Sequence, residues 1–210
     1  MIAVVDAGLG NIGSLLNMLD HLGLPARAAK TPADLEAADR LILPGVGAFD
    51  HGMARLHGSG LLPALEARVL HGLTPILGIC LGMQLLGRTS EEGIAPGLGW
   101  IPAHTMRFKF GANSAPLRIP HMGWNDVRAT TNNNLLDLGL DELGQRPRFY
   151  FVHSYHVVCD DPGDIAGTAE YGSSFTAAIR HRHIHGVQFH PEKSHHWGKL
   201  LLQRFASLPV

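Results

Sequence analysis

The chain has 210 residues, of which 45% are hydrophobic and 17% are charged, and its formal net charge at pH 7 is -1. This composition is ordinary for a soluble globular protein, the length allows a sizeable core, and we expect a single α/β domain over residues 1–210. A net charge near zero gives no electrostatic reason to expect a nucleic acid or an anionic membrane as a partner. No apolar run approaches the roughly 20 residues that span a membrane.

The N-terminal segment and the two cysteines suggest where the protein works. Residues 1–6 (M-I-A-V-V-D) predict a strand rather than a signal peptide, because no basic segment precedes a short apolar run. Cys80 and Cys159 could form one disulfide, but a lone pair in a chain without an export signal is expected to be reduced. We therefore predict a cytoplasmic protein, and we expect no cofactor.

The first half of the chain alternates predicted strands with predicted helices. Strands are expected at residues 2–5, 24–29, 41–43 and 74–79, and helices at 12–22, 31–38 and 61–70. This alternation predicts an α/β fold with an open, mostly parallel central sheet flanked by helices. Ligands of such sheets bind beyond the carboxyl ends of the strands.

After about residue 95 the pattern changes to short segments of alternating polarity separated by turn residues. Such period-two patterning predicts antiparallel strands, so we expect an added antiparallel sheet in the C-terminal half. The predicted strands are 104–110, 117–120, 124–127, 148–158 and a hairpin over 165–180. A polar turn is expected at 130–134 and a C-terminal helix at 196–206.

The first predicted turn contains Gly8, Gly10 and Gly13 in the pattern G-x-G-x-x-G, which is typical of dinucleotide sites. Such a site also needs an acidic residue about 20 positions later, at the end of the second strand. The corresponding segment here, P-A-R-A-A-K-T, ends with a basic residue. We therefore interpret the glycines as a tight turn.

Cys80 lies between Gly78 and Gly82, where a predicted strand meets a helical pattern. This G-x-C-x-G pattern is the thiol counterpart of the G-x-S-x-G elbow, which exposes a nucleophile at a sharp turn. Free N–H groups and the positive end of a helix dipole would favour a thiolate there. A buried structural cysteine fits the same segment, so this pattern alone leaves both interpretations open.

The segment P-G-V-G-A-F (44–49) follows the third predicted strand and carries two glycines. Such a loop can turn its backbone N–H groups toward an open crevice and hold an anion or a developing oxyanion. An ordinary strand-to-helix loop is the alternative.

His190 and Glu192 flank a proline in the segment G-V-Q-F-H-P-E. In extended chain, residues i and i+2 point to the same side, so the carboxylate can orient the imidazole. A surface turn would explain H-P-E in isolation. A Cys80 at the end of a strand in the same sheet favours a Cys-His-Glu triad instead.

The segment H-R-H-I-H (181–185), followed by His190, His195 and His196, is rich in histidine and raises the question of a metal. Their spacing matches neither the helical i, i+4 arrangement of zinc peptidases nor a Cys₂His₂ site. We therefore predict a solvated strand or loop and no metal.

Six segments together resemble the class I glutamine amidotransferases. G-x-C-x-G with H-P-E is specific to that superfamily, and P-H-M-G-W-N and H-P-E-K-S are specific to the glutaminase subunits of imidazole glycerol phosphate synthases in histidine biosynthesis. The resemblance covers essentially the whole chain. The segments are P-G-V-G-A-F (44–49), G-I-C-L-G-M-Q-L-L (78–86), S-E-E-G (90–93), P-H-M-G-W-N (120–125), F-Y-F-V-H-S-Y (149–155) and G-V-Q-F-H-P-E-K-S (186–194).

The resemblance implies that Cys80 attacks the side-chain amide of L-glutamine, with His190 as base and then acid and Glu192 orienting His190. Ammonia leaves, and water hydrolyses the resulting thioester to glutamate. Backbone N–H groups of an oxyanion hole are implied at Val46, Gly47 and Leu81. The residues implied to hold the amino-acid end of the substrate are Gln84, Glu92, Ser154 and Tyr155.

The resemblance also implies a partner, a synthase (cyclase) subunit that forms a heterodimer with the glutaminase. Docking of that subunit switches the glutaminase on, and ammonia reaches the synthase through a dry channel. The positions implied to face the partner are Met122, Trp124, Asn125, Tyr150 and Lys193. The residues alone would place Trp124 in the core.

Other functions fit parts of the same pattern. A paralogous glutaminase, which supplies ammonia to an ATP-dependent sugar amidotransferase in surface polysaccharide biosynthesis, shares these motifs. Another Cys-elbow hydrolase and a non-catalytic binding subunit are more distant alternatives. The intact set of Cys80, His190 and Glu192 argues against the non-catalytic alternative.

Overall fold

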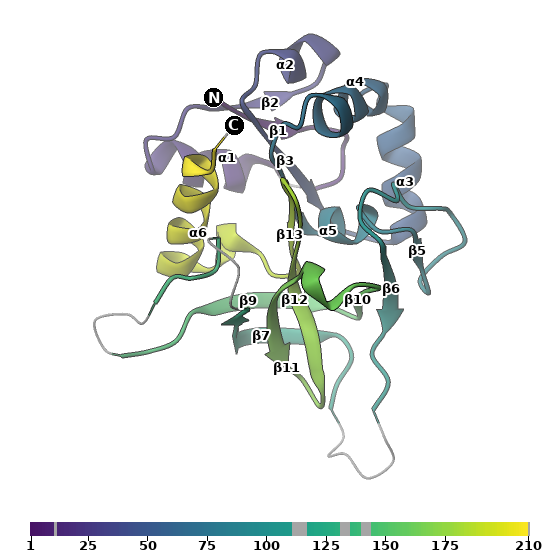
Figure 1. The fold of residues 1–210 in the computed structure, drawn as a ribbon, viewed down its shortest axis with the longest axis vertical. Coiled ribbons are helices and arrows are strands. Elements are labelled where there is room, and N and C mark those ends of the chain that lie inside the picture. The colour runs from purple at the N-terminus through teal and green to yellow at the C-terminus, as the bar shows by residue number, and fades with distance from the viewer. Residues whose placement is uncertain (11, 111–116, 131–134, 140–143, 210) are drawn as a thin grey trace.

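The computed structural model describes residues 1–10, 12–110, 117–130, 135–139 and 144–209 (Figure 1). The first half of the chain alternates strands and helices as predicted. Its elements are β1 (Ile2–Val5), α1 (Ile12–His21), β2 (Ala26–Ala29), α2 (Pro32–Glu36), β3 (Arg40–Gly45), α3 (Phe49–Gly58), α4 (Leu62–Glu66), the π-helical turn η1 (Ala67–His71), β4 (Ile76–Cys80) and α5 (Leu81–Leu85).

The second half is mostly strands and ends in the longest helix of the described chain. Its elements are β5 (Thr89–Ser90), β6 (Ala103–Arg107), β7 (His121–Asp126), β8 (Arg128–Ala129), β9 (Arg148–His153), β10 (Tyr155–Cys159), η2 (Pro162–Asp164), β11 (Ile165–Glu170), β12 (Ser174–His181), β13 (Ile184–Val187), η3 (Pro191–Lys193) and α6 (His195–Ser207).

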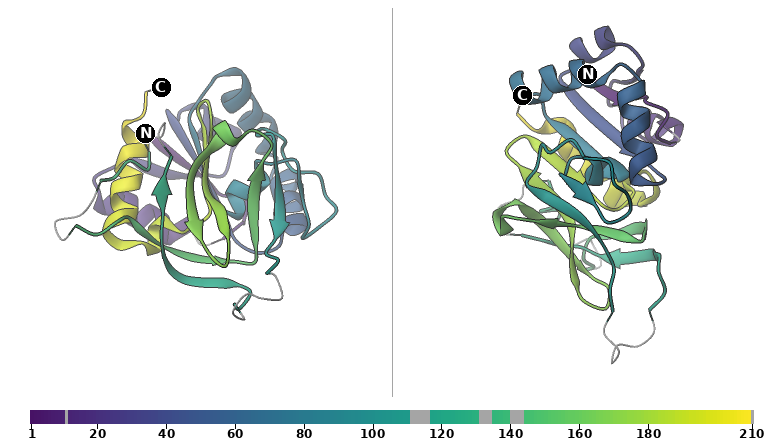
Figure 2. Two further views of the ribbon diagram at one scale, coloured as in Figure 1. Left: turned by 60° about the horizontal axis from the view of Figure 1, so that its bottom comes forward. Right: turned by 90° about the vertical axis from the view of Figure 1, so that its right-hand side faces the viewer.

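The central sheet has the strand order β2-β1-β3-β4-β13-β12-β10-β6-β5, and β11 and β8 branch from β12. The strands from β2 to β13 along this order are parallel, and β12 and β10 continue the sheet antiparallel. The C-terminal strands therefore extend the same sheet. Among the described strands only β7 and β9 form a separate antiparallel pair, which crosses the lower part of the main sheet beside β11 in Figure 1 and is seen from two further sides in Figure 2.

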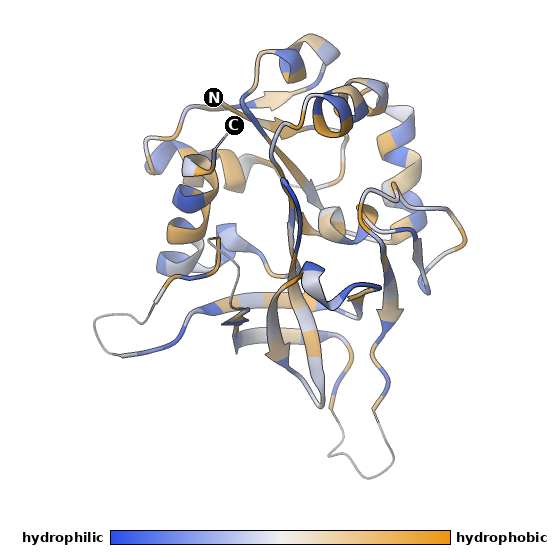
Figure 3. Cartoon of the chain, in the orientation of Figure 1, coloured by the Kyte–Doolittle hydropathy of each residue, from blue (hydrophilic) through white to orange (hydrophobic). Residues whose placement is uncertain are grey.

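Hydrophobic cores cover both faces of the parallel strands. Because successive strand residues point to opposite faces, Ala3 and Val5 pack with α2 to α5, whereas Ile2 and Val4 pack with α1 and α6. In Figure 3 the central strands are mostly apolar, whereas the helices around them carry both apolar and hydrophilic residues. None of the helices in the described part of the chain combines the length and apolar character needed to cross a membrane.

One helix was missed, one predicted strand was wrong, and one predicted turn lies partly outside the described residues. Helix α3 was not predicted, because Gly52 and several polar residues obscure the buried stripe of Phe49, Met53 and Leu56. Residues 117–120 form no strand. Of the predicted turn at 130–134, only Thr130 is described.

Backbone contacts between β3, β4 and α5 fix the turn at Cys80. A Cβ atom on Gly82 would lie 1.9 Å from the carbonyl oxygen of Leu43, and one on Gly78 would lie 2.7 Å from the carbonyl oxygen of Gly82. Any larger residue at these positions would force the three elements apart. The strand-to-helix turn therefore depends on glycine at both sites.

Gly82→Ala is expected to lower the free energy of unfolding by about 1–3 kcal/mol, because the added methyl group cannot be accommodated without backbone movement. The matched control is Gly58→Ala at the end of α3, where a Cβ would meet nothing within 4 Å. That change is expected to be neutral or stabilising by up to about 1 kcal/mol. Urea denaturation of both variants measures the difference, and equal stabilities would contradict the prediction.

Candidate active site

Cys80 is the last residue of β4 and directly precedes α5. Its backbone angles, φ 54° and ψ -112°, are strained for a residue with a side chain. A strained conformation persists where the packing around it holds it in place. Here the close glycine contacts between β3, β4 and α5 do so. The sharp turn places the thiol at the carboxyl end of a central strand.

The sheet register brings the H-P-E segment to the same edge. β13 pairs in parallel with β4, with Val187 opposite Ile79, so the chain that follows β13 lies beside Cys80. β13 ends at Val187, and Glu192 lies in the short 3₁₀ helix η3 rather than in the extended chain that was predicted. The side chains nevertheless converge, and His190 Nδ1 lies 2.7 Å from Glu192 Oε1.

The surroundings of His190 favour its charged form. Burial lowers the pKa of His190, but hydrogen bonding and the charges of Cys80 and Glu192 outweigh burial and raise it to about 9. Among the described residues Nε2 makes no hydrogen bond of ordinary geometry, although the ring is close enough to Cys80 for the sulfur to raise its pKa. The protonated imidazole of His190 therefore supplies a positive charge and a proton donor next to the Cys80 sulfur.

A cavity of about 200 Å³ opens at this edge. Cys80 and His190 line it together with every residue predicted for the oxyanion hole and for substrate binding. The lining residues are Val46, Gly47, Cys80, Leu81, Gln84, Glu92, Val152, His153, Ser154, Tyr155 and His190.

The predicted oxyanion donors differ in their hydrogen bonding. Leu81 begins α5, so its N–H is among those that have no partner within the helix. Gly47 has a positive φ of 98°, which suits glycine. The N–H of Val46 is already engaged, because it donates to the carbonyl oxygen of Leu9 at 2.7 Å.

Two of the predicted substrate residues also have partners within the protein. Glu92 Oε2 accepts a hydrogen bond of 2.9 Å from the N–H of Phe49, which begins α3. Gln84 Nε2 donates to the carbonyl oxygen of Tyr155 at 3.3 Å and to Gln188 Oε1 at 3.0 Å. Both side chains are therefore fixed in place at the cavity wall.

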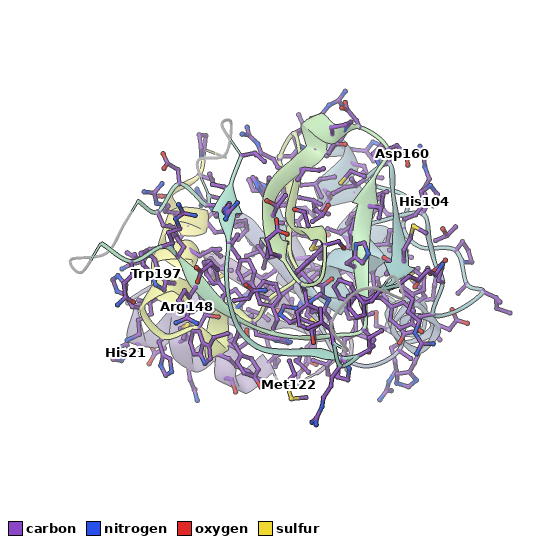
Figure 4. The ribbon with its side chains drawn as sticks, turned by 90° about the horizontal axis from the view of Figure 1, so that it is seen from below. His21, His104, Met122, Arg148, Asp160 and Trp197 are labelled. Carbon is purple, nitrogen blue, oxygen red and sulfur yellow. The ribbon has the colours of Figure 1, made fainter. Side chains whose placement is uncertain are left out.

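The five predicted partner-facing residues do not all point the same way. Met122 and Trp124 are exposed by 62% and 42% on one face of β7, and Met122 points outward at the edge of the molecule in Figure 4. Trp124 contacts Tyr150 edge-on, and Lys193 Nζ lies 6.0 Å from the centre of the Tyr150 ring.

Asn125 lies on the other face of β7 from Met122 and Trp124. Its Nδ2 donates to the carbonyl oxygen of Glu170 at 2.8 Å and lies 3.3 Å from His121 Nε2. The side chain of Asn125 therefore points into the protein.

Three polar residues near the site were not predicted. Gln188 donates to the sulfur of Cys80 at 3.7 Å, and His153 lines the cavity. Ser194 is fully buried, and its hydroxyl joins the carbonyl oxygen of His190 to the N–H of Tyr150. All three lie inside the motifs that carry the resemblance, which is the only sequence signal that could have indicated them.

The prediction of a solvated histidine segment holds only in part: His195 and His196 are exposed, whereas the histidines within residues 181–185 are half-buried or buried. His185 is buried in β13, His181 pairs with Asp164 at 2.9 Å, and His183 lies 2.7 Å from the carbonyl oxygen of Val69. Within the described ranges no three His, Cys, Asp or Glu side chains are grouped as metal ligands. Cys80 and Cys159 are both free thiols.

An open α/β sheet with a cysteine at a strand-to-helix elbow and a His-Glu pair beside it defines a class of enzymes with a cysteine nucleophile. The chain belongs to a particular family of that class, the class I glutamine amidotransferases. The model of the family "Glutamine amidotransferase class-I" matches residues 3–207.

Similar proteins extend over the full chain. The "Imidazole glycerol phosphate synthase subunit HisH 2" of Methanococcus maripaludis is 48% identical over 205 residues, which cover 98% of each chain. The protein of the same name from Pseudomonas aeruginosa is 48% identical over 208 residues, which cover 99% of this chain and 100% of that one.

A solved structure of a glutamine amidotransferase has the same fold, with a TM-score of 0.67 at 22% identity over 98% of this chain and 96% of that one.

Glu192→Gln is expected to lower the pKa of His190, because removing the carboxylate charge disfavours the imidazolium. The shift should exceed about one unit for a charge in direct hydrogen-bond contact. NMR titration of the imidazole measures it. Glu36→Gln, at an exposed position of α2, is the control and should leave the His190 titration unchanged. An unchanged midpoint in Glu192→Gln would contradict the prediction.

Proposed function

We propose that this chain, as one domain over residues 1–210, is the glutaminase subunit of an imidazole glycerol phosphate synthase. It hydrolyses L-glutamine to glutamate and ammonia in the cytoplasm. The ammonia passes to a synthase (cyclase) subunit, with which the chain forms a heterodimer in histidine biosynthesis.

One observation carries the glutaminase chemistry. His190 is held by Glu192 at 2.7 Å in a cavity that also contains the strained Cys80. The choice of this particular glutaminase rests on the names of relatives that are 48% identical over the whole chain. Those names favour the synthase over a sugar amidotransferase as the partner.

In the first half of the reaction the Cys80 thiolate attacks the amide carbon of the glutamine side chain. A C–S bond forms and the carbonyl oxygen becomes an oxyanion. The imidazolium of His190 gives its proton to the amide nitrogen, and ammonia leaves as the C–N bond breaks. Glu192 holds the His190 ring in position and stabilises its charge.

In the second half water hydrolyses the γ-glutamyl thioester. His190, now neutral, takes a proton from water as the oxygen attacks the thioester carbon. The C–S bond breaks and releases glutamate. Cys80 leaves as a thiolate, so the imidazolium–thiolate pair is restored.

The oxyanion needs N–H donors fixed at the cavity wall. The N–H groups of Leu81 and Gly47 serve this role, since such donors contribute the largest single stabilisation of an acyl-transfer transition state. Val46 contributes only after its peptide turns away from Leu9, to which it is bonded at 2.7 Å. The full oxyanion hole therefore requires movement of residues 45–47.

The cavity suits the amino-acid end of glutamine. Glu92 offers a carboxylate to the α-amino group, and its position is fixed by the hydrogen bond from Phe49. Ser154 and Tyr155 supply hydroxyl and backbone N–H donors for the α-carboxylate. The volume of about 200 Å³ limits the substrate to a small molecule.

The partner surface consists of Met122, Trp124, Tyr150 and Lys193. Exposed aromatic and methionine side chains are enriched in protein interfaces. Lys193 lies in η3 directly after Glu192, so this surface adjoins the His-Glu pair.

Cys80→Ser is expected to abolish glutamine-dependent product formation by the complex while ammonia-dependent turnover stays intact. The loss should be at least about 10³-fold, because the nucleophile is removed. Assays of the complex with glutamine or with an ammonium salt as nitrogen source make the measurement. A glutamine-dependent rate equal to that of the wild type would exclude the proposed mechanism.

Co-purification identifies the partner directly. A tagged chain expressed in its own organism is expected to retain a (βα)₈-barrel synthase subunit. Recovery of an ATP-dependent sugar ligase in its place would contradict the assignment to histidine biosynthesis.

Trp124→Ala is expected to weaken binding of the synthase subunit by about tenfold or more, because a large aromatic anchor is lost. Leu70→Ala is the control, since Leu70 is exposed by 41%, similar to Trp124, but lies before the amino end of β4. Titration calorimetry of both variants with the synthase subunit measures the change. Equal affinities would place the interface elsewhere.

A further inference from the structure

A series of polar side chains connects β7 to the sulfur of Cys80 through the interior of the protein. Each member lies within hydrogen-bond distance of the next, and we call the series the amide–histidine chain. Its members are, in order, Asn125, His121, His153, the carbonyl group of Tyr155, Gln84, Gln188 and Cys80.

The histidine part of the amide–histidine chain has one consistent set of hydrogen-bond donors and acceptors. His153 Nδ1 lies 2.7 Å from the carbonyl oxygen of Tyr155, so this nitrogen carries the proton and donates. His153 Nε2 then accepts from His121 Nδ1 at 2.9 Å, and His121 Nε2 accepts from Asn125 Nδ2 at 3.3 Å. Both imidazoles must be neutral for this arrangement.

The environment keeps these two rings neutral and fixed. His121 stacks between Phe151 and Tyr171, with ring centroids 4.9 Å and 4.1 Å away. Burial lowers the pKa of His121 to about 4 and that of His153 to about 3. Protonation of either ring would place two donors against each other.

The glutamine part of the amide–histidine chain continues to the Cys80 sulfur. The carbonyl oxygen of Tyr155 also accepts from Gln84 Nε2, which donates in turn to Gln188 Oε1 at 3.0 Å. This contact leaves Gln188 Nε2 to donate to the sulfur of Cys80 at 3.7 Å. Gln188 is fully buried, and within the described part of the protein the hydrogen bonds of its side chain join Gln84 to the Cys80 sulfur.

An N–H donor aimed at the sulfur stabilises a thiolate and restricts the rotation of its side chain. Asn125, at the other end of the amide–histidine chain, lies on β7. The opposite face of β7 carries Met122 and Trp124. Displacement of β7 would therefore reach the Cys80 sulfur through fixed polar contacts.

We propose that the amide–histidine chain positions the Cys80 thiolate and connects its reactivity to the position of β7. Gln188, His121 and His153 act in this arrangement as positioning residues. The inference deepens the proposed glutaminase function and depends on it for its biological meaning. The reactivity of the Cys80 thiol tests it without any glutamine.

The first test measures alkylation of Cys80 by iodoacetamide in the isolated full chain, located by peptide mass spectrometry. Cys159 interferes little, because burial raises the pKa of its thiol to about 12. Gln188→Met keeps the length of the side chain but removes the N–H donor. Its rate constant at pH 7 is expected to fall about tenfold, with the pH midpoint of alkylation shifted upward.

The second test compares two substitutions of His121. His121→Gln keeps one donor and one acceptor, so alkylation should stay close to the wild-type rate. His121→Phe keeps an aromatic ring between Phe151 and Tyr171 but interrupts the hydrogen bonds of the amide–histidine chain. The alkylation rate of Cys80 should therefore fall about threefold. A purely packing role for His121 predicts the reverse order, in which the phenylalanine variant is the less affected.

His185→Phe is the matched control. His185 is a buried histidine on β13, and it is not a member of the amide–histidine chain. Burial lowers its pKa to about 4. Its substitution is expected to change thermal stability and to leave the alkylation rate of Cys80 unchanged. The proposal is overturned if Gln188→Met and His121→Phe also react at the wild-type rate.

Glutaminase assays of the complex separate this inference from the proposed function. His121→Phe should lower kcat with little change in KM, because His121 is not among the residues that line the cavity. A wild-type complex that hydrolyses no glutamine would overturn the proposed function. The alkylation rates would still decide whether the amide–histidine chain positions Cys80. An active wild type with an unchanged kcat in His121→Phe would overturn only the inference.

Discussion

The close approach of three backbone segments is the constraint on which the site depends. β3, β4 and α5 meet at Gly45, Gly78 and Gly82, where a single added Cβ would lie 1.9 to 2.7 Å from a backbone atom. These contacts leave Cys80 in a strained conformation, with φ 54°. The strain directs the sulfur into the cavity at the carboxyl edge of the sheet, where ligands of parallel sheets bind. Without this packing the thiol would be one more buried side chain of a strand.

The rest of the site is assembled on both sides of that edge. The parallel pairing of β13 with β4 brings His190 and Glu192 from the far end of the sequence to the elbow. Ser194 ties this segment to β9, which belongs to the small second sheet and carries His153 into the cavity. The site therefore lies where the two sheets meet, and its geometry depends on both of them.

Histidines in one small region show opposite shifts of pKa for a clear physical reason. His190 is buried beside a carboxylate and a thiol, and these groups stabilise its charge and raise its pKa to about 9. His153 and His121 are buried among aromatic rings without a negative partner, and burial lowers their pKa to about 3 and 4. The first can move protons near neutral pH, and the other two serve as neutral hydrogen-bonding groups. The counter-charge, more than the depth of burial, separates the two roles.

The sequence by itself determined the alternation of strands and helices in the first half, the elbow at Cys80 and the convergence of His190 with Glu192. These features are local, because they follow from residue periodicity, from glycine spacing and from a two-residue separation across a proline. Only the tertiary structure decided that Val46 donates to Leu9, that Asn125 points inward and that Gln188 contacts the Cys80 sulfur. Helix α3 was also recognised only in the tertiary structure, because polar residues and a glycine obscure its buried apolar stripe in the sequence. Such partners lie far apart in the sequence, and the order and register of the strands, which no local pattern specifies, bring them together.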